Sequence, residues 1–326
     1  MCGEKIMKVF STFTGIGGFE VGIQNAFEAT RLLQGIDHKD SSTANIPGCL
    51  STEPFCVGYS EIDKYAISVY EKHFKGAKNY GDITKIKTED LPDFDCLVGG
   101  FPCQAFSVAG KRGGFSDTRG TLFFELARIL QAKQPRLFVF ENVKGLLSHD
   151  GGKTFRTIIA AITELGYDVQ WQVLNSKDFG VAQNRERVIF VGHLRGTARP
   201  EVFPIAGAIS AHTFIRTIRA GGAASGTEKH ARDLIQVNNP THSNDRVYDD
   251  NGISPTLNTM QGGRRQPKIN GPVIRRLTPL ECERLQGFPD NWTVGESDTQ
   301  RYKMAGNAVT TNVIQAVFER IFESGL

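Results

Sequence analysis

Residues 7–19 read MKVFSTFTGIGGF, and this stretch decides the fold class. Residues 7–13 are rich in the aromatic and β-branched side chains that favour a strand. A glycine loop follows at 14–18, and residues 19–31 are expected to form a helix. A strand, a glycine-rich turn and a helix in this order are typical of the first unit of an α/β sheet that binds ligands at the carboxyl ends of its strands.

The alternation of strands and helices continues as far as residue 193. Further strands are predicted at 55–60, 94–99, 136–141, 168–174 and 187–193, and further helices at 63–74, 119–132 and 153–165. Strands that alternate with helices of about 12 residues predict a mostly parallel sheet covered on both faces. We therefore expect an α/β fold with a doubly wound, Rossmann-like sheet.

The composition changes from about residue 196. Residues 219–272 are rich in Gly, Asn, Ser, Thr and Pro and show no long periodic segment, which predicts a smaller, loop-rich domain. A helix is then expected at 278–286, because Thr278 suits the N-cap position and Pro279 the first helical position. Residues 308–323 place apolar side chains on one face and predict a final amphipathic helix.

These segments define the expected domains. Residues 1–194 and 301–326 are predicted to form one large domain around the sheet. Residues 195–300 are predicted to form a second domain together with its hinge. Residues 35–54 are expected to be a surface insertion because they are rich in Gly, Asp, Ser, Thr and Pro.

Composition and charge narrow the class of protein. The chain has 326 residues, of which 40% are hydrophobic and 22% charged, and no apolar run approaches the roughly 20 residues that span a membrane. No secretory signal is recognisable, so a cytoplasmic location is expected. Residues 195–276 carry 12 Lys and Arg against 6 Asp and Glu, although the net charge of the whole chain is only +3. This segment suits an anionic partner such as nucleic acid, and a solvated loop region explains the charge equally well.

Six cysteines are present, and none forms a CxxC pair. A structural zinc site and a disulfide framework are therefore not expected, and no metal is required. Cys103 follows Pro102 directly after the predicted strand at 94–99. From the residues alone, this thiol is either a nucleophile or an inert small side chain.

Acidic residues follow several predicted strands. Glu61 ends the second strand and Asp82 lies near the end of a third, so both are expected at the ligand-binding edge of the sheet. Glu61 is placed to accept hydrogen bonds from ribose hydroxyls, and Asp82 is placed to accept one from an adenine amino group. The glycine loop lacks the third glycine of a dinucleotide fingerprint, because Glu20 occupies that position. Together, the loop and the two acids favour an adenosine-type cofactor over a purely structural turn.

Three further side chains are candidates for catalysis. Glu141 closes an apolar strand, where a partly desolvated carboxyl group can donate a proton. Arg185 precedes the strand at 187–193 and Arg187 begins it, and in an extended chain the two side chains point to the same face. Two guanidinium groups on one face suit a phosphate or a developing anion. The alternatives are a surface salt bridge for Glu141 and a solvated strand edge for the arginines.

These features occur in a recognisable order along nearly the whole chain. The matching stretches are Phe13 to Phe19, Glu61, Gly81-Asp82-Ile83, Gly100-Phe101-Pro102-Cys103-Gln104, Glu141-Asn142-Val143, Gln183 to Arg187, Arg276 to Cys282 with Gly287-Phe288-Pro289, and Gly306-Asn307-Ala308-Val309. The chain resembles the cytosine-5 DNA methyltransferases, especially the short bacterial and phage enzymes. Each motif is modest by itself, but eight in this order are specific.

The resemblance implies a fold of the S-adenosylmethionine-dependent methyltransferases, with S-adenosyl-L-methionine as methyl donor and S-adenosyl-L-homocysteine as product. By resemblance, Cys103 attacks C6 of the target cytosine, and Glu141 holds and protonates N3. Arg185 would support the activated base, and Arg187 would help to hold the site together. The implied cofactor-binding residues are Phe13, Gly15, Gly17, Gly18, Glu61, Asp82, Ile83, Phe101, Pro102, Asn307 and Ala308.

The resemblance also implies double-stranded DNA as the partner, with the target base flipped out of the helix. The segment 195–272 corresponds to the target-recognition domain, and the glycine-containing loop at 107–118 resembles a lid. The implied DNA-binding residues are Gln104, Ser107, Arg119, Arg246, Thr256, Arg264 and Arg265. The enzyme is expected to be a monomer that acts in restriction-modification or in protection of phage or host DNA. A cognate restriction endonuclease is a candidate functional partner.

The chain departs from the family pattern at three places. Ile62 stands where a tryptophan is frequent, Ser11-Thr12 replaces a more usual Asp-Leu, and residues 35–54 are longer than expected. Two other functions remain open for this fold: an RNA methyltransferase, and a DNA-binding regulator without activity. The Pro-Cys-Gln sequence argues against the first, and the complete set of catalytic residues argues against the second.

Overall fold

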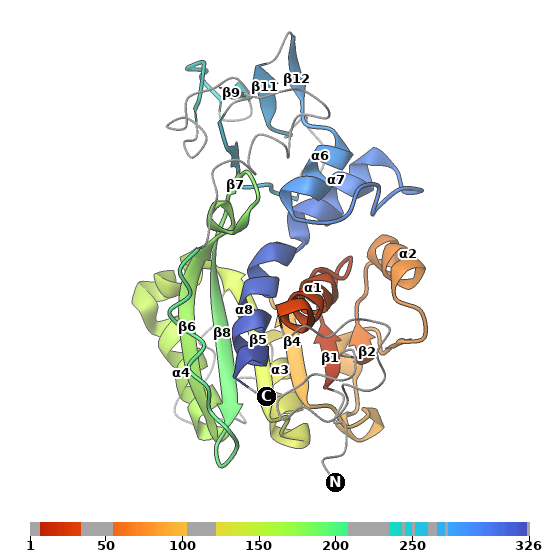
Figure 1. Cartoon of the computed structure of the whole chain (residues 1–326), viewed down its shortest axis with the longest axis vertical. Coiled ribbons are helices and arrows are strands. Elements are labelled where there is room, and N and C mark those ends of the chain that lie inside the picture. Colours follow the sequence, from red (N-terminus) through yellow and green to blue (C-terminus); the bar gives the residue numbers. More distant parts are fainter. Residues whose placement is uncertain are drawn as a thin grey trace.

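The computed structural model describes residues 7–33, 55–102, 122–207, 235–242, 245–249, 252–259, 266–270 and 273–324. Within these residues, the centre of the molecule is a seven-stranded sheet with the strand order β3-β2-β1-β4-β5-β8-β6 (Figure 1). The strands are β1 Lys8–Thr12, β2 Phe55–Ser60, β3 Lys78–Asn79, β4 Cys96–Gly100, β5 Leu137–Val143, β6 Tyr167–Asn175 and β8 Glu186–Leu194. Neighbouring strands from β3 to β5 are parallel, so the predicted α/β fold with a mostly parallel sheet is confirmed.

Strand β8 runs against its neighbours. It pairs antiparallel with β5, where Arg187 lies opposite Val143, and antiparallel with β6. The amino end of β8 therefore lies at the same edge of the sheet as the carboxyl ends of β1, β4 and β5. In an all-parallel sheet, Arg187 would have been at the opposite edge.

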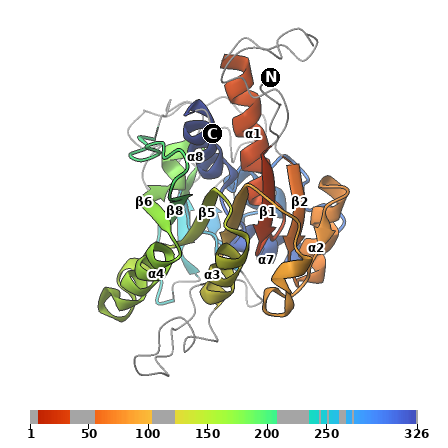
Figure 2. The same ribbon diagram turned by 90° about the horizontal axis from the view of Figure 1, so that it is seen from below.

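Helices cover both faces of the sheet (Figure 2). One face packs against α1 Gly18–Leu33 and α8 Thr311–Glu323, and the other packs against α3 Leu122–Lys133 and α4 Lys153–Glu164. Side chains alternate along each strand, so Val9 of β1 faces the first pair of helices and Phe10 faces the second. Helix α2 Lys64–His73 packs on β2 through Tyr70 and Tyr59, whose ring centroids are 4.2 Å apart.

The glycine loop connects β1 to α1 through a tight turn. Gly15 and Gly17 have φ angles of 57° and 88°, a region that glycine adopts without strain. At Gly17, a Cβ atom would also lie 2.3 Å from the Phe74 ring. This loop can therefore approach α2 closely because it carries no side chain there.

A second region lies beyond the carboxyl edge of the sheet (Figure 1). It contains β9 Val247–Asp249, β11 Lys268–Asn270 and β12 Ile274–Arg276, and the helices α6 Pro279–Leu285 and α7 Asp298–Asn307. A two-residue strand, β10 Ser254–Pro255, pairs in parallel with β7 Gln183–Asn184 and joins this region to the central sheet. A small apolar cluster that includes Ile253, Ile269, Leu285 and Ala305 holds it together.

The predicted helix at 278–286 is confirmed as α6. The Thr278 side chain accepts a hydrogen bond from the Glu281 amide, and the Glu281 side chain accepts one from the Thr278 amide, which forms a capping box. Helix α7 was not predicted. The expected insertion at 35–54 lies outside the described residues, and none of the described helices is long and apolar enough to cross a membrane. Short 3₁₀ helices span Ile83–Lys85, Thr88–Asp90, Lys144–Leu147, His149–Gly152 and Ser176–Phe179.

Candidate active site

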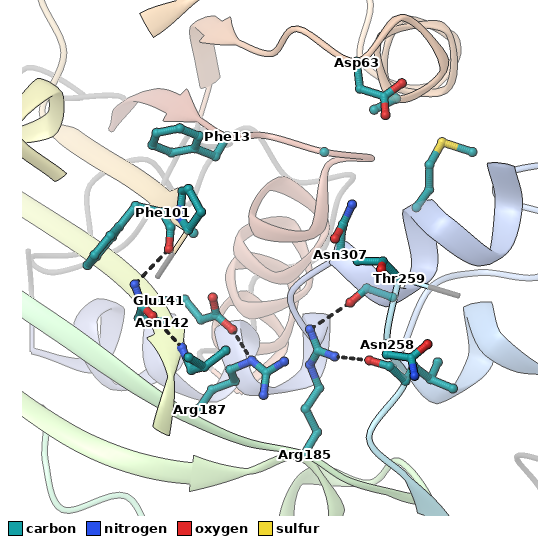
Figure 3. A pocket seen from close by; sticks show the side chains of 18 of the residues that line it. Phe13, Asp63, Phe101, Glu141, Asn142, Arg185, Arg187, Asn258, Thr259 and Asn307 are labelled. Atoms are coloured by element: carbon teal, nitrogen blue, oxygen red, sulfur yellow. Dashed lines mark hydrogen bonds and ion pairs between the residues drawn. The ribbon is translucent and has the colours of Figure 1, made fainter. Parts of the chain in front are cut away.

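A pocket of about 570 Å³ lies between the carboxyl edge of the sheet and the second region (Figure 3). Its walls come from the ends of β1, β2, β4 and β5, from the start of α2 and β8, from residues 256–259 and from the end of α7. The lining residues are Phe13, Gly15, Glu61, Asp63, Ala66, Gly100, Phe101, Pro102, Glu141, Asn142, Val143, Arg185, Arg187, Thr256, Leu257, Asn258, Thr259, Met304, Gly306 and Asn307.

Glu141 and Arg187 form an ion pair in this pocket. The Glu141 Oε1 atom is 2.8 Å from Arg187 Nε, and the two side chains are 12% and 15% exposed. Glu141 comes from β5 and Arg187 from the start of β8, so the antiparallel direction of β8 creates the pair. A charge-assisted hydrogen bond with so little exposure holds the carboxylate in one orientation.

Arg185 is only two residues away but has different partners. Its side chain donates hydrogen bonds to the carbonyl oxygens of Leu257, Gly306 and Ala308 at 3.0, 3.2 and 2.9 Å. The residue is 3% exposed, and burial, with a smaller effect of nearby Arg187, lowers its pKa to about 9. Both arginines line the pocket as expected, but Arg185 is bound by main-chain carbonyls, whereas Arg187 is paired with an acid.

Glu61 is fixed between the glycine loop and the start of α2. Its Oε2 atom accepts a hydrogen bond from the Gly15 amide, and its Oε1 atom accepts hydrogen bonds from the Ile62 and Asp63 amides, each at 2.8 Å. A carboxylate has about four lone-pair positions, so it can still accept hydrogen bonds from a ligand. The carboxylate is thus pre-oriented at one end of the pocket.

Aromatic side chains contribute to the same wall. Phe13 follows β1 with a φ angle of 50°, which is unusual for a residue with a side chain and is often found at ligand sites. Phe101 is buried, and its carbonyl oxygen accepts a hydrogen bond of 2.8 Å from the Asn142 side chain. Asn142 therefore ties the end of β5 to the segment that leads from β4 to Pro102.

Five predicted cofactor residues do not line the pocket. Asp82 caps the short helix at Ile83–Lys85, and hydrogen bonds from Thr84 hold the pKa of its carboxyl group below the usual value. Ile83 is part of the apolar core on the face of the sheet that packs against α3 and α4. The other three are Gly17, Gly18 and Ala308, and Ala308 contributes through its carbonyl bond to Arg185.

Several lining residues were not predicted. Asp63 and Ala66 lie at the start of α2, and Met304 lies in α7. Asn258 and Thr259 follow the predicted Thr256 and extend along the same wall. Their position directly after the predicted Thr256 was the available sequence signal. The helix α7 itself gave no periodic signal because its sequence is not amphipathic, although Gly306 and Asn307 at its end belong to a matching motif.

The predicted DNA-binding residues divide into two groups. Thr256 lines the pocket and donates a hydrogen bond of 2.6 Å to the Asn184 carbonyl oxygen, and Arg246 is exposed before β9, away from the lining residues. The remaining predictions lie outside the described residues: the nucleophile Cys103, the loop at 107–118 and the residues Gln104, Ser107, Arg119, Arg264 and Arg265. Among the described residues, no group of three His, Cys, Asp or Glu side chains is arranged to hold a metal ion.

Comparison with known proteins identifies the family. A family model described as C-5 cytosine-specific DNA methylase matches residues 7–323. The type II methyltransferase M.NlaX of Neisseria lactamica is 37% identical over 331 residues, which cover 97% of this chain and 96% of that protein. The type II methyltransferase M.HhaI of Haemophilus parahaemolyticus is 36% identical over 290 residues, which cover 82% of this chain and 88% of that protein.

Solved structures show the same fold. A DNMT2 variant of Spodoptera frugiperda matches with a TM-score of 0.68 at 16% identity, over 97% of this chain and 99% of that one. The Dnmt2 methyltransferase of S. pombe matches with a TM-score of 0.66, also at 16% identity, over 98% of this chain and 99% of that one. The fold, the match to the family model and the curated relatives agree: the chain belongs to the C-5 cytosine-specific DNA methylase family and is an enzyme of the DNA (cytosine-5-)-methyltransferase type.

Proposed function

We propose that the pocket binds S-adenosylmethionine at its Phe13–Glu61 end and a flipped-out cytosine at its Glu141–Arg187 end. The observation that carries this proposal is the single cavity shared by both groups of residues. Its volume lies within the range of about 300 to 1,000 Å³ that is usual for ligand pockets. A methyl group can pass directly from one ligand to the other only if both lie in such a continuous space.

The residues at the cofactor end fit an adenosine group. The Glu61 carboxylate is already oriented by three backbone amides and has lone pairs left for ribose hydroxyls. Phe13 offers an aromatic ring at the wall, and Asn307 offers an amide side chain from the end of α7. When bound there, S-adenosylmethionine supplies an electrophilic methyl group to the C5 carbon of the base.

The residues at the base end fit the activation of cytosine. The Cys103 thiolate adds to C6, and a proton passed to N3 through the Glu141 carboxyl group makes C5 a carbon nucleophile. Arg187 holds the Glu141 side chain in place through the ion pair. After methylation, a base removes the C5 proton, the Cys103 thiolate leaves C6, and N3 gives back its proton, which restores the neutral aromatic ring. Pro102 lines the pocket, and Cys103 is the next residue in the chain.

We further propose that the enzyme recognises a specific sequence in double-stranded DNA and protects that DNA in a restriction-modification setting. The named relatives M.NlaX and M.HhaI are type II methyltransferases. The excess of positive charge over residues 195–276 suits contacts with phosphates. Under this proposal, residues 195–300 form the reading domain.

Methyl transfer from labelled cofactor to duplex DNA tests the proposal. The wild-type enzyme should label DNA, and it should form a denaturation-resistant adduct with a duplex that contains 5-fluorocytosine. Cys103→Ser should abolish both signals, because a hydroxyl group is a poor nucleophile towards C6 and the adduct needs the thiolate. Wild-type transfer by this variant would refute the covalent mechanism.

The two remaining functions are tested in the same experiment. Transfer to tRNA with none to DNA would favour an RNA methyltransferase. Tight DNA binding without any turnover would favour a regulator.

A further inference from the structure

Asp63 and Lys303 form an ion pair at the edge of the pocket, and neither takes part in the chemistry proposed above. The Asp63 Oδ2 atom lies 2.6 Å from Lys303 Nζ, and the pair joins positions 240 residues apart. Asp63 itself lines the pocket. Lys303 directly precedes the lining part of α7, which contains Met304, Gly306 and Asn307.

The two oxygens of Asp63 have separate partners. Oδ1 accepts a hydrogen bond of 3.0 Å from the Tyr65 amide and caps α2, whereas Oδ2 accepts the hydrogen bond from Lys303. Burial acts to raise the pKa of Asp63, but the hydrogen bonds from Lys303 and the Tyr65 amide outweigh it and lower the pKa. The side chains of Asp63 and Lys303 are only 23% and 28% exposed, so solvent screens the pair incompletely.

Helices α2 and α7 do not depend on this pair for their packing. An apolar cluster that contains Ala66, Val69, Phe288 and Met304 lies between them. The far end of α2 is held separately, because the His73 ring stacks on Trp292 with a centroid distance of 3.6 Å. The pair therefore acts locally, at the rim of the pocket.

The other end of the same α7 segment is held from the base side. The carbonyl oxygens of Gly306 and Ala308 accept hydrogen bonds from Arg185. The wall formed by residues 304–307 is thus fixed at one end by α2 and at the other by the start of β8. Helix α7 is also held from α6, because Arg301 pairs with the buried Glu283 at 2.9 Å and the Gln286 side chain donates a hydrogen bond to the Ala305 carbonyl oxygen. The Lys303 pair is the ionic contact that ties this helix to the start of α2.

We propose that Asp63 and Lys303 are a positioning pair that fixes the α7 wall and thereby sets the affinity for the methyl donor. This inference rests on the proposed function of the pocket. The pair lies on the Glu61 side, so its loss weakens cofactor binding and leaves the Glu141–Arg187 end in place. A pair with this exposure is expected to change the affinity about fivefold.

Calorimetric binding of S-adenosylhomocysteine without DNA tests the role. The variants are Lys303→Met, Asp63→Asn and the double variant; asparagine keeps the N-cap, since Asn and Asp are equally good caps. Each single variant should raise the Kd about fivefold, and the double variant should be no weaker, because both changes remove the same pair. In turnover, KM for the cofactor should rise while KM for DNA and kcat stay unchanged.

Lys133→Met is the matched control, because Lys133 pairs with Asp93 at 3.3 Å and neither residue lines the pocket. Its Kd should equal that of the wild type. Wild-type Kd values in Lys303→Met and Asp63→Asn would overturn the positioning role, including when their melting temperatures fall. If the wild-type protein itself binds no S-adenosylhomocysteine, the proposed function fails, and the positioning role fails with it.

Discussion

The central sheet and residues 252–259 supply different walls of one pocket, and they hold those walls in different ways. The sheet presents Glu141 and Arg187 from strands of seven and nine residues whose neighbours are largely buried. Residues 252–259 contain only the two-residue strand β10, and their backbone is held by the side chains of Gln183 and Arg185.

This difference separates two kinds of residue. On the sheet, side chains provide chemical groups, and the buried strands keep them rigid. In the wall formed by residues 252–259, many of the contacts are made by main-chain atoms. The position of this wall depends on polar side chains that extend to it from the sheet. We therefore expect substitutions on the sheet wall to affect catalysis and substitutions at the junction to affect stability.

Glu141→Gln should have the largest effect. An amide cannot give N3 a proton and cannot form the ion pair with Arg187, so the rate of methyl transfer should fall about 10³-fold. Initial rates at saturating cofactor and DNA measure this change. Glu186→Gln is the neighbouring control, because Glu186 pairs with Lys144 at the surface, and its rate should stay near that of the wild type. Equal rates for both variants would remove Glu141 from catalysis.

Arg185→Met should mainly reduce stability. The carbonyl groups of Leu257 and Gly306 would lose their side-chain donor in a buried place, and that of Ala308 would keep only a longer bond of 3.3 Å from Gln286, which should cost about 3 to 4 kcal/mol in the free energy of unfolding. Urea unfolding of the variant and the wild type measures this loss of stability. Arg199→Met removes an exposed pair with Asp168 and should cost less than about 1 kcal/mol. If the two variants lose the same stability, Arg185 does not connect the walls.

Much of the sheet wall could be predicted from the sequence, because buried strands have apolar runs and the residues that follow them meet at one edge. Phe13, Glu61 and Glu141 were located in this way. The direction of β8 was not predicted, although the absence of a helix between 174 and 187 was a signal for an antiparallel pair. The partners of Arg185 could not be predicted, since main-chain carbonyls far along the chain leave no pattern in side chains.

A third test concerns the sheet side alone. Glu20 is buried at the start of α1, where burial raises its pKa from 4.5 to about 7. Because the folded protein holds this proton more tightly than the unfolded chain, the contribution of Glu20 to stability is full below pH 4.5 and is lost as the pH rises to about 7. At pH 8, Glu20→Gln should be more stable than the wild type by about 2 to 3 kcal/mol.

Urea unfolding of both proteins between pH 4 and pH 8 provides the comparison. The difference in stability between them should grow from pH 4.5 to pH 7 and then remain constant. A constant difference over the whole range would contradict the raised pKa. In the same experiment, the stability of Arg185→Met should depend on pH as that of the wild type does, because this change lies at the junction and leaves Glu20 in place.

Thr256→Val should have the smallest effect. The Thr256 hydroxyl group donates a hydrogen bond to the Asn184 carbonyl oxygen, and an exposed bond of this kind contributes about 1 kcal/mol. Its loss should lower stability by that amount and leave kcat nearly unchanged. A loss of 3 kcal/mol or more would show that this hydroxyl group, rather than Arg185, is the main connection between the walls.

The close approach of Gly306 to Asn258 has a consequence for evolution. A Cβ atom at position 306 would lie 1.9 Å from the Asn258 carbonyl oxygen, so the junction tolerates no side chain there. Main-chain atoms also form the β7–β10 pairing and accept the hydrogen bonds of Arg185. Contacts of this kind do not depend on the identity of residue 258, so the segment beyond them can diverge in sequence, or be exchanged for another, while the catalytic sheet and its junction stay the same.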